Sequence, residues 1–431
     1  MTNNKNQYSS NLGAILTMIG VAVGLGNIWR FPYMMGAYGG SAFLLIYLIF
    51  TILLAFPALL TEMSLGKHIG TGTLNAYKSL FKGRLGVILG YLLITVVTIA
   101  GSYYAVVVAN VFFSAGFSVI KGFSNEANPY FQQLLSNGVI QYGLTILLII
   151  AALFTSYKGL KNGIEKISKI IMPFFLLSIL YMIIHAWLMP GALDRVKQFL
   201  SPDFTAIGST EIFAALGQAF FSIGLGGTFV VVYASYISKT KEIPKIAILT
   251  CLGDLGSSLL VSLFLVPSIL VLGMKMDAGP SLIFNTFPEL FTNLPGGRWV
   301  GSLFLVSLSL VAFLSLVASF QVPISSLSEL KISKKKLIIS FGILQLILAF
   351  PSALYPNIIG VLDLVFGSGM QVFGSMLAII GIWWGTKRSI YIKKLFNNPN
   401  SKRAFFFTFW LRWVVPVTLL TVLIGYIYNS I

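Results

Sequence analysis

Hydrophobic residues occur in long runs along this chain, and polar residues gather in the short stretches between the runs. A helix needs about 20 mainly apolar residues to cross the hydrocarbon of a bilayer. Runs of this kind predict eleven membrane-spanning helices, over residues 11–36, 41–66, 86–120, 139–157, 166–189, 212–238, 246–273, 299–328, 336–352, 357–385 and 404–428.

Lysine and arginine residues concentrate in every second connection between these spans. If the N-terminus lies inside the cell, most of the 29 basic residues fall on the cytoplasmic side, as is typical of membrane proteins. We therefore expect a multi-pass protein of the cell (inner) membrane. Its N-terminus is expected in the cytoplasm, and its C-terminus on the extracellular or periplasmic side.

Glycine-rich sequences interrupt two of the spans at corresponding places. Span 1 contains Gly-Val-Ala-Val-Gly-Leu-Gly-Asn over residues 20–27, and span 6 contains Phe-Ser-Ile-Gly-Leu-Gly-Gly-Thr over residues 221–228. Because span 1 starts inside and span 6 starts outside, the two halves have opposite orientations, which is the inverted-repeat plan of secondary transporters. The sequence predicts an all-α membrane protein with a 5+5 inverted-repeat transporter fold, broken helices 1 and 6, and an eleventh span.

The same pattern divides the chain into six parts. They are a cytoplasmic N-terminal segment, a first five-helix repeat, an extracellular loop, a second five-helix repeat, a cytoplasmic loop and the eleventh span, over residues 1–10, 11–189, 190–211, 212–385, 386–403 and 404–431. Because the eleventh span falls outside the repeat, we expect it at the periphery of the bundle.

Composition supports the membrane assignment and excludes other classes. Hydrophobic residues make up 57% of the chain and charged residues 10%, whereas soluble domains carry about 25% charged residues. The net charge of +17 is explained by lysines that face the anionic lipids of the cytoplasmic leaflet. Membrane lipid is therefore an expected partner and nucleic acid is not. The polar residues inside the spans form no nucleophile–base set, so an enzyme is not expected.

Few charged residues lie inside the spans, and such residues are functional by default. Glu62 in span 2 is expected to accept hydrogen bonds from unwound backbone and so to support a break. Asp254 in span 7 is expected to bind a cation. The alternative for Asp254 is a neutral buried acid or a polar contact between helices.

Unwound backbone near these acids can bind an ion and a zwitterion. A half-helix N-terminus presents free N–H groups that suit a carboxylate. Freed carbonyls, together with the side chains of Asn27 and Ser222, suit Na⁺. Glycine lets the backbone approach such ligands closely, and close packing between helices is the alternative role for these glycines.

The first break and its surroundings resemble a known family. Gly-Val-Ala-Val-Gly-Leu-Gly-Asn-Ile-Trp-Arg-Phe-Pro-Tyr, followed by Gly-Gly-Ser-Ala-Phe, is similar to the first-span signature of the neurotransmitter:sodium symporters. The resemblance extends through Gln218-Ala-Phe-Phe-Ser222 and Tyr233-Ala-Ser-Tyr236 to most of spans 1–10. Eleven spans resemble the bacterial amino-acid transporters of this family.

The resemblance implies one or two bound sodium ions. The positions that match the family's first sodium site are Ala22, Asn27, Ser222 and Asp254. Those that match the second are Gly20, Val23, Val311 and Ser315, with Leu314 where family members often carry a second hydroxyl. The chloride site of other members matches Tyr47, Gln218, Ser222 and Ser258. Chloride is not expected here, because the Asp254 carboxylate would repel it at low dielectric.

The resemblance also implies an amino-acid substrate, because Gly24 stands where monoamine carriers have an aspartate. The positions that match the family's substrate site are Ala22, Leu25, Gly26, Ala100, Tyr104, Phe221, Ser222, Gly224, Gly227, Ser315 and Ser319. Small residues along the pocket favour a large hydrophobic or aromatic side chain, since an unfilled void loses contact energy. Glycine at position 224 also resembles carriers of longer substrates such as GABA, which keeps that class open.

Gates can be assigned by the same resemblance. Tyr104 and Phe221 are expected to close over the substrate from outside, with Arg30 and Asp363 as the outer ion pair. The positions that match the inner network are Lys5, Tyr8, Tyr236 and Glu329.

These features together predict Na⁺-coupled symport of a neutral amino acid by alternating access. Two alternatives remain open from the sequence. One is a proton-coupled or uncoupled carrier of the same architecture, and the other is a non-transporting membrane sensor on this scaffold. The sequence also leaves open whether the protein forms a homodimer.

Overall fold

The computed structural model describes residues 7–238, 240–275, 281–330, 332–385, 388–396 and 398–428. Within these ranges every regular element is a helix. The helices of the first repeat are α1 (Asn11–Ala22), η2 (Gly26–Arg30), α2 (Phe31–Ala37), α3 (Ser41–Phe50), η3 (Thr51–Ala55), α4 (Phe56–Ile69), α6 (Arg84–Ile120), α8 (Gly138–Gly159), η4 (Leu160–Glu165) and α9 (Lys166–Trp187).

The second half follows the same plan. Its spans are built from α11 (Ser209–Ser222), α12 (Phe229–Ser235), α13 (Ile243–Val271), α15 (Gly297–Leu327), α16 (Lys334–Leu354), α17 (Ile358–Leu362), η8 (Asp363–Gly369) and α18 (Met370–Trp383). The last span is α20 (Lys402–Phe409), η9 (Trp410–Val414) and α21 (Val415–Tyr428). Elements labelled η are 3₁₀ or π turns, and most of them continue a neighbouring helix.

Eight helices among the described residues are long and apolar enough to cross a membrane, and nine are if Asn11–Ala22 and Gly26–Ala37 form one span. The sequence predicts eleven spans, and two features account for the difference. The continuous stretch Gly138–Trp187 is 50 residues long and contains the fourth and fifth predicted spans. The halves of span 6, α11 and α12, have 14 and 7 residues, so each alone is shorter than a span.

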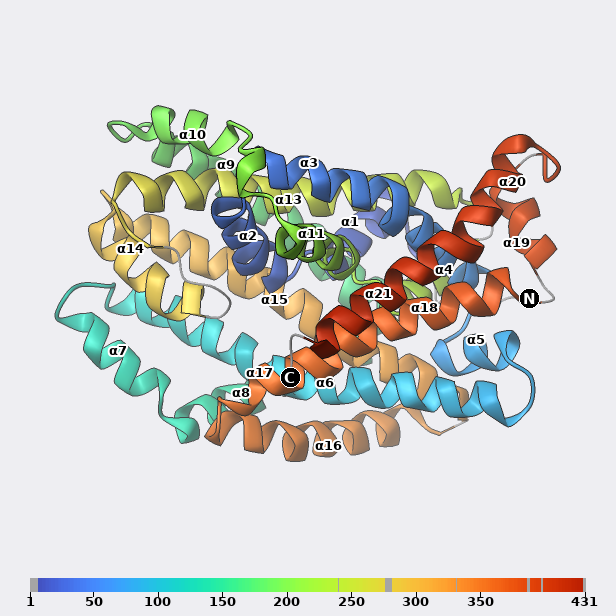
Figure 1. Cartoon of the computed structure of the whole chain (residues 1–431). Helices are drawn as coiled ribbons and strands as arrows, with labels where there is room; N and C mark the ends of the chain where they lie inside the picture. Colours follow the sequence, from blue (N-terminus) through green and yellow to red (C-terminus); the bar gives the residue numbers. More distant parts are fainter. Residues whose placement is uncertain are drawn as a thin grey trace.

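Short helices between the spans lie at the two ends of the bundle (Figure 1). α5 (Thr73–Leu80) and α19 (Arg388–Leu395) lie at one end, and α7 (Ala127–Leu135), α10 (Ala192–Leu200) and α14 (Phe287–Asn293) lie at the other. The first group comes from connections predicted inside and the second from connections predicted outside. The segregation of the loops therefore agrees with the predicted alternation of the spans.

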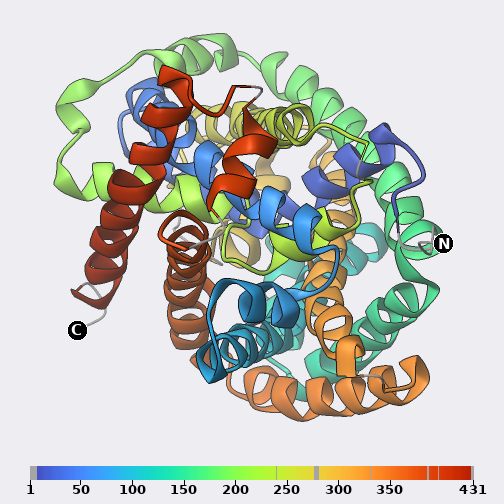
Figure 2. The same cartoon turned by 90° about the vertical axis from the view of Figure 1, so that its right-hand side faces the viewer.

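The last span lies at the periphery of the bundle (Figure 2). Only 22% of its most apolar window is buried inside the protein, compared with 78% for Gly297–Leu330. α15, which provides most of Gly297–Leu330, packs on α6 and α9 in the middle of the fold. The central helices therefore come from the two repeats.

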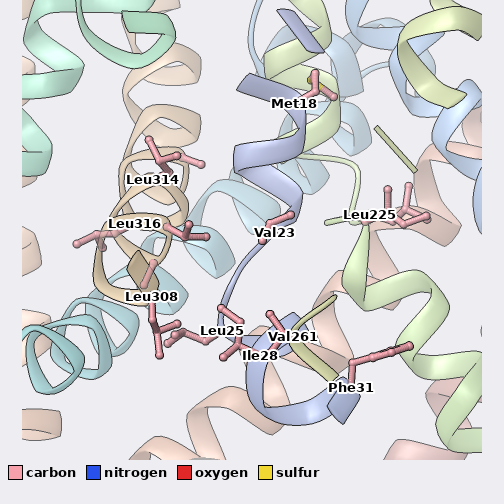
Figure 3. Close-up of a cluster of buried hydrophobic side chains, with 14 of the residues drawn as sticks. Met18, Val23, Leu25, Ile28, Phe31, Leu225, Val261, Leu308, Leu314 and Leu316 are labelled. Carbon is pink, nitrogen blue, oxygen red and sulfur yellow. The ribbon is translucent and has the colours of Figure 1, made fainter. Parts of the chain in front are cut away.

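The first break separates α1 from η2. Ser10 caps the start of α1 by accepting a hydrogen bond from the Gly13 N–H (2.9 Å). The helix stops where Val23 adopts extended backbone, with φ −69° and ψ 114°. The chain becomes helical again at Gly26, and the axis has turned by 64°. Figure 3 shows this connection, with Val23 and Leu25 between the two helical pieces.

The second break separates α11 from α12 and is held by a buried acid. Gly224 and Gly227 have positive φ angles of 69° and 68°, which glycine adopts without steric cost. Glu62 of α4 is fully buried and accepts a hydrogen bond from the Gly226 N–H at Oε1 (3.2 Å). The carboxylate thus satisfies a backbone donor that the interrupted helix leaves without a carbonyl partner.

Replacement of Glu62 tests this support. Glu62→Ala leaves the Gly226 N–H without its acceptor, which costs about 1–3 kcal/mol for a buried donor. Glu62→Gln keeps a side-chain oxygen and is expected to retain most of the stability. Thermal unfolding of the purified protein in detergent measures both effects. Equal melting temperatures for the alanine variant and the parent would show that the break does not depend on Glu62.

Candidate functional site

Asn27 connects the first break to the second. Its Oδ1 accepts a hydrogen bond from the Gly24 N–H (2.9 Å), which closes the break locally. Its Nδ2 donates to Ser222 Oγ (3.1 Å), at the end of α11, and to Asp254 Oδ1 (2.7 Å), on α13. One side chain therefore bonds to its own break, to the other broken helix and to span 7.

Asp254 lies at the centre of this cluster. The residue is 1% exposed, and Ser222 donates to its Oδ2 (2.6 Å). Ser258, one turn further along α13, accepts from Asn27 Nδ2 (2.7 Å) and donates to the Asp254 backbone carbonyl (3.1 Å). A carboxylate, two hydroxyls and an amide from three different elements thus surround one buried point.

A backbone carbonyl just past the end of α1 bonds to α15. The last carbonyls of a helix have no partner inside it, and α1 ends at Ala22. The Val23 carbonyl accepts a hydrogen bond from Ser315 Oγ of α15 (3.0 Å). Val23 and Ser315, two residues of the predicted second sodium site, are therefore in contact. Gly20, a third residue of that site, faces Leu314 of α15.

Phe221 and Tyr104 lie on either side of the first break. An ideal Cβ on Gly26 would stand 2.6 Å from Phe221 Cε1, so the Phe221 ring packs directly on the backbone of Gly26. The corresponding point on Gly24 would stand 3.8 Å from the Tyr104 hydroxyl and 3.3 Å from Ser315 Oγ. The absence of a side chain at Gly26 is what allows the Phe221 ring to approach so closely, whereas the Tyr104 hydroxyl would be at ordinary contact distance from a side chain at Gly24.

The remaining small positions of the predicted substrate pocket differ from one another. An ideal Cβ on Gly224 would meet nothing within 4 Å, so open space adjoins this residue. On Gly227 it would stand 2.0 Å from the Tyr77 hydroxyl, so that direction is filled. Ser319 is buried and Ala100 is partly exposed, and Ser319 Oγ lies 3.0 Å from an ideal Cβ on Gly101, the neighbour of Ala100. Of the two glycines, only Gly224 leaves room in the direction that a side chain would take.

Residues of the predicted outer gate contact aromatic side chains. The Arg30 guanidinium lies over the Phe221 ring, 5.2 Å from its centroid, which is a cation–π arrangement. Asp363 accepts a hydrogen bond from the Tyr103 hydroxyl (3.1 Å). Tyr103 is not among the residues that the sequence predicts for this gate, although it precedes Tyr104 in the chain.

The predicted inner network is described in part, because Lys5 lies outside the described residues. The Tyr8 N–H donates to the Tyr236 carbonyl and its hydroxyl donates to the Tyr233 carbonyl, both at 3.2 Å. Tyr233 lies in the last turn of α12 and Tyr236 directly follows that helix, so Tyr8 caps its C-terminal end. The Tyr236 hydroxyl donates to Ser325 Oγ (3.1 Å).

Glu329 has partners that the sequence does not indicate. Its two carboxylate oxygens accept hydrogen bonds from the N–H groups of Gly72 (2.6 Å) and Asn75 (3.1 Å). Glu329 therefore caps the start of α5, where the free N–H groups favour a negative charge. The described bonds of Glu329 thus tie the end of span 8 to α5.

Two further residues escape prediction from the sequence. The Tyr77 hydroxyl donates to the Gly374 carbonyl (3.0 Å) and fills the space beside Gly227. Glu165 is 1% exposed, accepts from the Ser9 N–H (2.9 Å) and pairs with Lys169 (2.7 Å). Glu165 stands in a lysine-rich stretch, which by itself favours a solvated surface acid.

Known proteins share this arrangement over nearly the whole chain. The crystal structure of MhsT in complex with L-phenylalanine matches 97% of this chain and 99% of its own, with a TM-score of 0.86 and 28% identity. An uncharacterized sodium-dependent transporter of Bacillus subtilis, YhdH, is 28% identical over 98% of this chain and 97% of its own length.

Two further relatives are also named sodium-dependent transporters. An uncharacterized sodium-dependent transporter of Methanocaldococcus jannaschii, MJ1319, is 31% identical over 91% of this chain and 85% of its own. The sodium- and chloride-dependent creatine transporter 1 of Mus musculus is 26% identical over 71% and 57%. Residues 5–124 and 119–430 match the model of the sodium:neurotransmitter symporter family. The chain therefore belongs to the sodium:neurotransmitter symporter family, whose members are transporters rather than enzymes.

Proposed function

We propose that the protein is a sodium-coupled symporter of a neutral amino acid with a large hydrophobic or aromatic side chain. The observation that carries this proposal is the convergence of Asn27, Ser222 and Asp254 where both helices are interrupted. An ion that touches all three and the substrate carboxylate would couple the two ligands, because each would raise the affinity of the other.

The chemistry of the cluster favours a hard monovalent cation. All of its candidate ligands are oxygen atoms, and hard cations prefer oxygen. The Asn27 Nδ2 donors stand where a cation would meet the oxygens of Ser222 and Asp254. Rotation of the Asn27 amide would turn its Oδ1 toward the same point and give up its bond to the Gly24 N–H, so sodium would replace the Nδ2 donors and leave that N–H to another acceptor.

The substrate class rests on the surroundings of the first break. Gly24 leaves no carboxylate to hold an isolated amine. Open space adjoins Gly224, and MhsT, which shares the fold, has been crystallised with L-phenylalanine. Tyr104 and the N–H groups near Gly26 would hold the substrate carboxylate, and Phe221 would cover the substrate from outside.

Alternating access would then move the two ends of the bundle around this fixed site. The positive-inside pattern supports a cytoplasmic position for Tyr8, Tyr236 and Glu329, which would form the inner closure together with Lys5. The outer closure would be formed by Arg30, Phe221 and Asp363. Along the chain, Tyr8 precedes the first break and Arg30 follows it, whereas Phe221 begins the second break and Tyr236 follows it.

Sodium removal is the test of this function. In proteoliposomes at fixed pH, replacement of external sodium by choline is expected to reduce amino-acid uptake at least about tenfold. Asp254→Asn, which removes a charge beside the ion, should raise the half-saturating sodium concentration by about tenfold. Ser257→Ala is the matched control on α13, because that hydroxyl donates only to the carbonyl of Gly253 in its own helix.

A proton-coupled carrier would give a different result. Its uptake would persist in choline and would follow an imposed pH gradient, and the Asn variant would lose that response. Binding of substrate with no flux in either gradient would instead favour a membrane sensor.

Chloride is expected to have no effect. The side chains of Tyr47 and Gln218 are fully buried, and Ser258 of the same predicted chloride set bonds to Asp254, whose fixed charge would oppose a second anion. Replacement of chloride by gluconate at constant sodium should leave the initial uptake rate unchanged. A loss of uptake that chloride restores, with Asp254 intact, would contradict this expectation.

Competition measures the substrate preference. Unlabelled tryptophan, tyrosine, leucine and methionine are expected to inhibit uptake of labelled phenylalanine at concentrations at least about tenfold lower than glycine or alanine, because burial of a large apolar side chain is worth about 1.5–3 kcal/mol. The same assay should include GABA and creatine. Stronger inhibition by glycine, GABA or creatine than by the aromatic amino acids would reject the proposed substrate class.

A further inference from the structure

The two positions predicted to hold sodium have different surroundings. At the first, polar side chains from η2, α11 and α13 converge around the Asp254 carboxylate. At the second, α1 faces α15 and α9, and the side chains that meet there are mostly apolar. Since both positions adjoin the same break, this difference bears directly on how many ions the break can hold.

Hydrocarbon occupies the space beside Gly20. An ideal Cβ on Gly20 would stand 3.0 Å from Leu314 Cδ1 and 3.5 Å from Met172 Sδ. Leu314 is 4% exposed and Met172 is 6% exposed, so both side chains are part of the packed core. Leu314 lies on the part of α15 that faces α1 (Figure 3). A methyl group and a thioether provide no ligand that suits a hard cation.

The polar groups at this position already satisfy one another. Ser315 Oγ donates to the Val23 carbonyl (3.0 Å), which is the freed carbonyl nearest to the break. A buried carbonyl that has a hydroxyl donor no longer needs a cation to replace its lost helical partner. Ser315 supplies the one hydroxyl among the predicted ligands, and the other three are backbone carbonyls, of Gly20, Val23 and Val311.

We infer that the second position does not bind sodium in this protein, and that one sodium ion is transported with each substrate molecule. This inference rests on the proposed function. The Leu314 side chain fills the space on the Gly20 side, and the Val23 carbonyl and the Ser315 hydroxyl satisfy each other without an ion. The contact between α1 and α15 is therefore made by packing, which is present whether or not an ion is bound.

The ratio of sodium to substrate flux decides the matter. In proteoliposomes loaded with neither ligand, labelled sodium and labelled phenylalanine are followed together under a fixed membrane potential. One sodium ion per phenylalanine and a Hill coefficient of about one for sodium are expected. Two sodium ions per phenylalanine in the parent protein would overturn the inference.

A pair of isosteric variants tests the role of Leu314. Leu314→Thr introduces a hydroxyl at the position, and Leu314→Val has the same shape without the oxygen. The threonine variant is expected to transport two sodium ions per substrate and the valine variant one. If the parent transports one ion and the threonine variant also stays at one, Leu314 is not the cause and the assignment is rejected.

The outcomes also separate this inference from the proposed function. Uptake that does not respond to sodium at all would reject the sodium symporter itself. Sodium-dependent uptake with a ratio of two would leave the symporter intact and reject only the single-ion coupling. The parent protein alone distinguishes these cases, so the test does not depend on the folding of any variant.

Discussion

The need to satisfy backbone groups inside a membrane governs this structure. Each interrupted helix leaves N–H and C=O groups that no water reaches in hydrocarbon, at a cost of several kcal/mol each. Glu62 supplies the acceptor for one break, and the Asn27 amide oxygen supplies it for the other. Because Asn27 also bonds to Asp254, the geometry of the first break is tied to the side chains that gather at the centre.

The two breaks are held by different kinds of contact. In the break of span 6, the Glu62 carboxylate accepts from the Gly226 N–H, and the Tyr77 hydroxyl fills the space beside Gly227. The break in span 1 is closed by its own side chain, and its freed Val23 carbonyl turns to Ser315 of another helix. The first break is therefore held by its own side chain and by a hydroxyl of α15, whereas the second is held by side chains of the first repeat.

Sequence patterns predict the fold well, because glycine-rich interruptions and charge alternation act locally. They also identify Asn27 and Asp254, since a polar side chain inside a span is costly to bury and therefore stands out from its apolar neighbours. They do not identify Tyr77 beside Gly227, because that contact joins a connecting helix to a distant break. The sequence does not predict the contacts of Glu165 for a related reason, because only the folded chain brings the Ser9 backbone to its carboxylate. Glu329 is predicted for the inner network only through the family resemblance, and its bonds to the start of α5 depend on tertiary geometry.

The buried Asp254 carboxylate has an electrical consequence. Under the proposed loading, its negative charge, one sodium ion and a zwitterion add up to zero, so the filled site is electrically neutral while the bundle reorients around it. The empty site would carry the aspartate charge alone, and each elementary charge that crosses the field is worth about 2.3 kcal/mol per 100 mV. Voltage would then act on the return of the empty carrier rather than on the step that delivers the substrate.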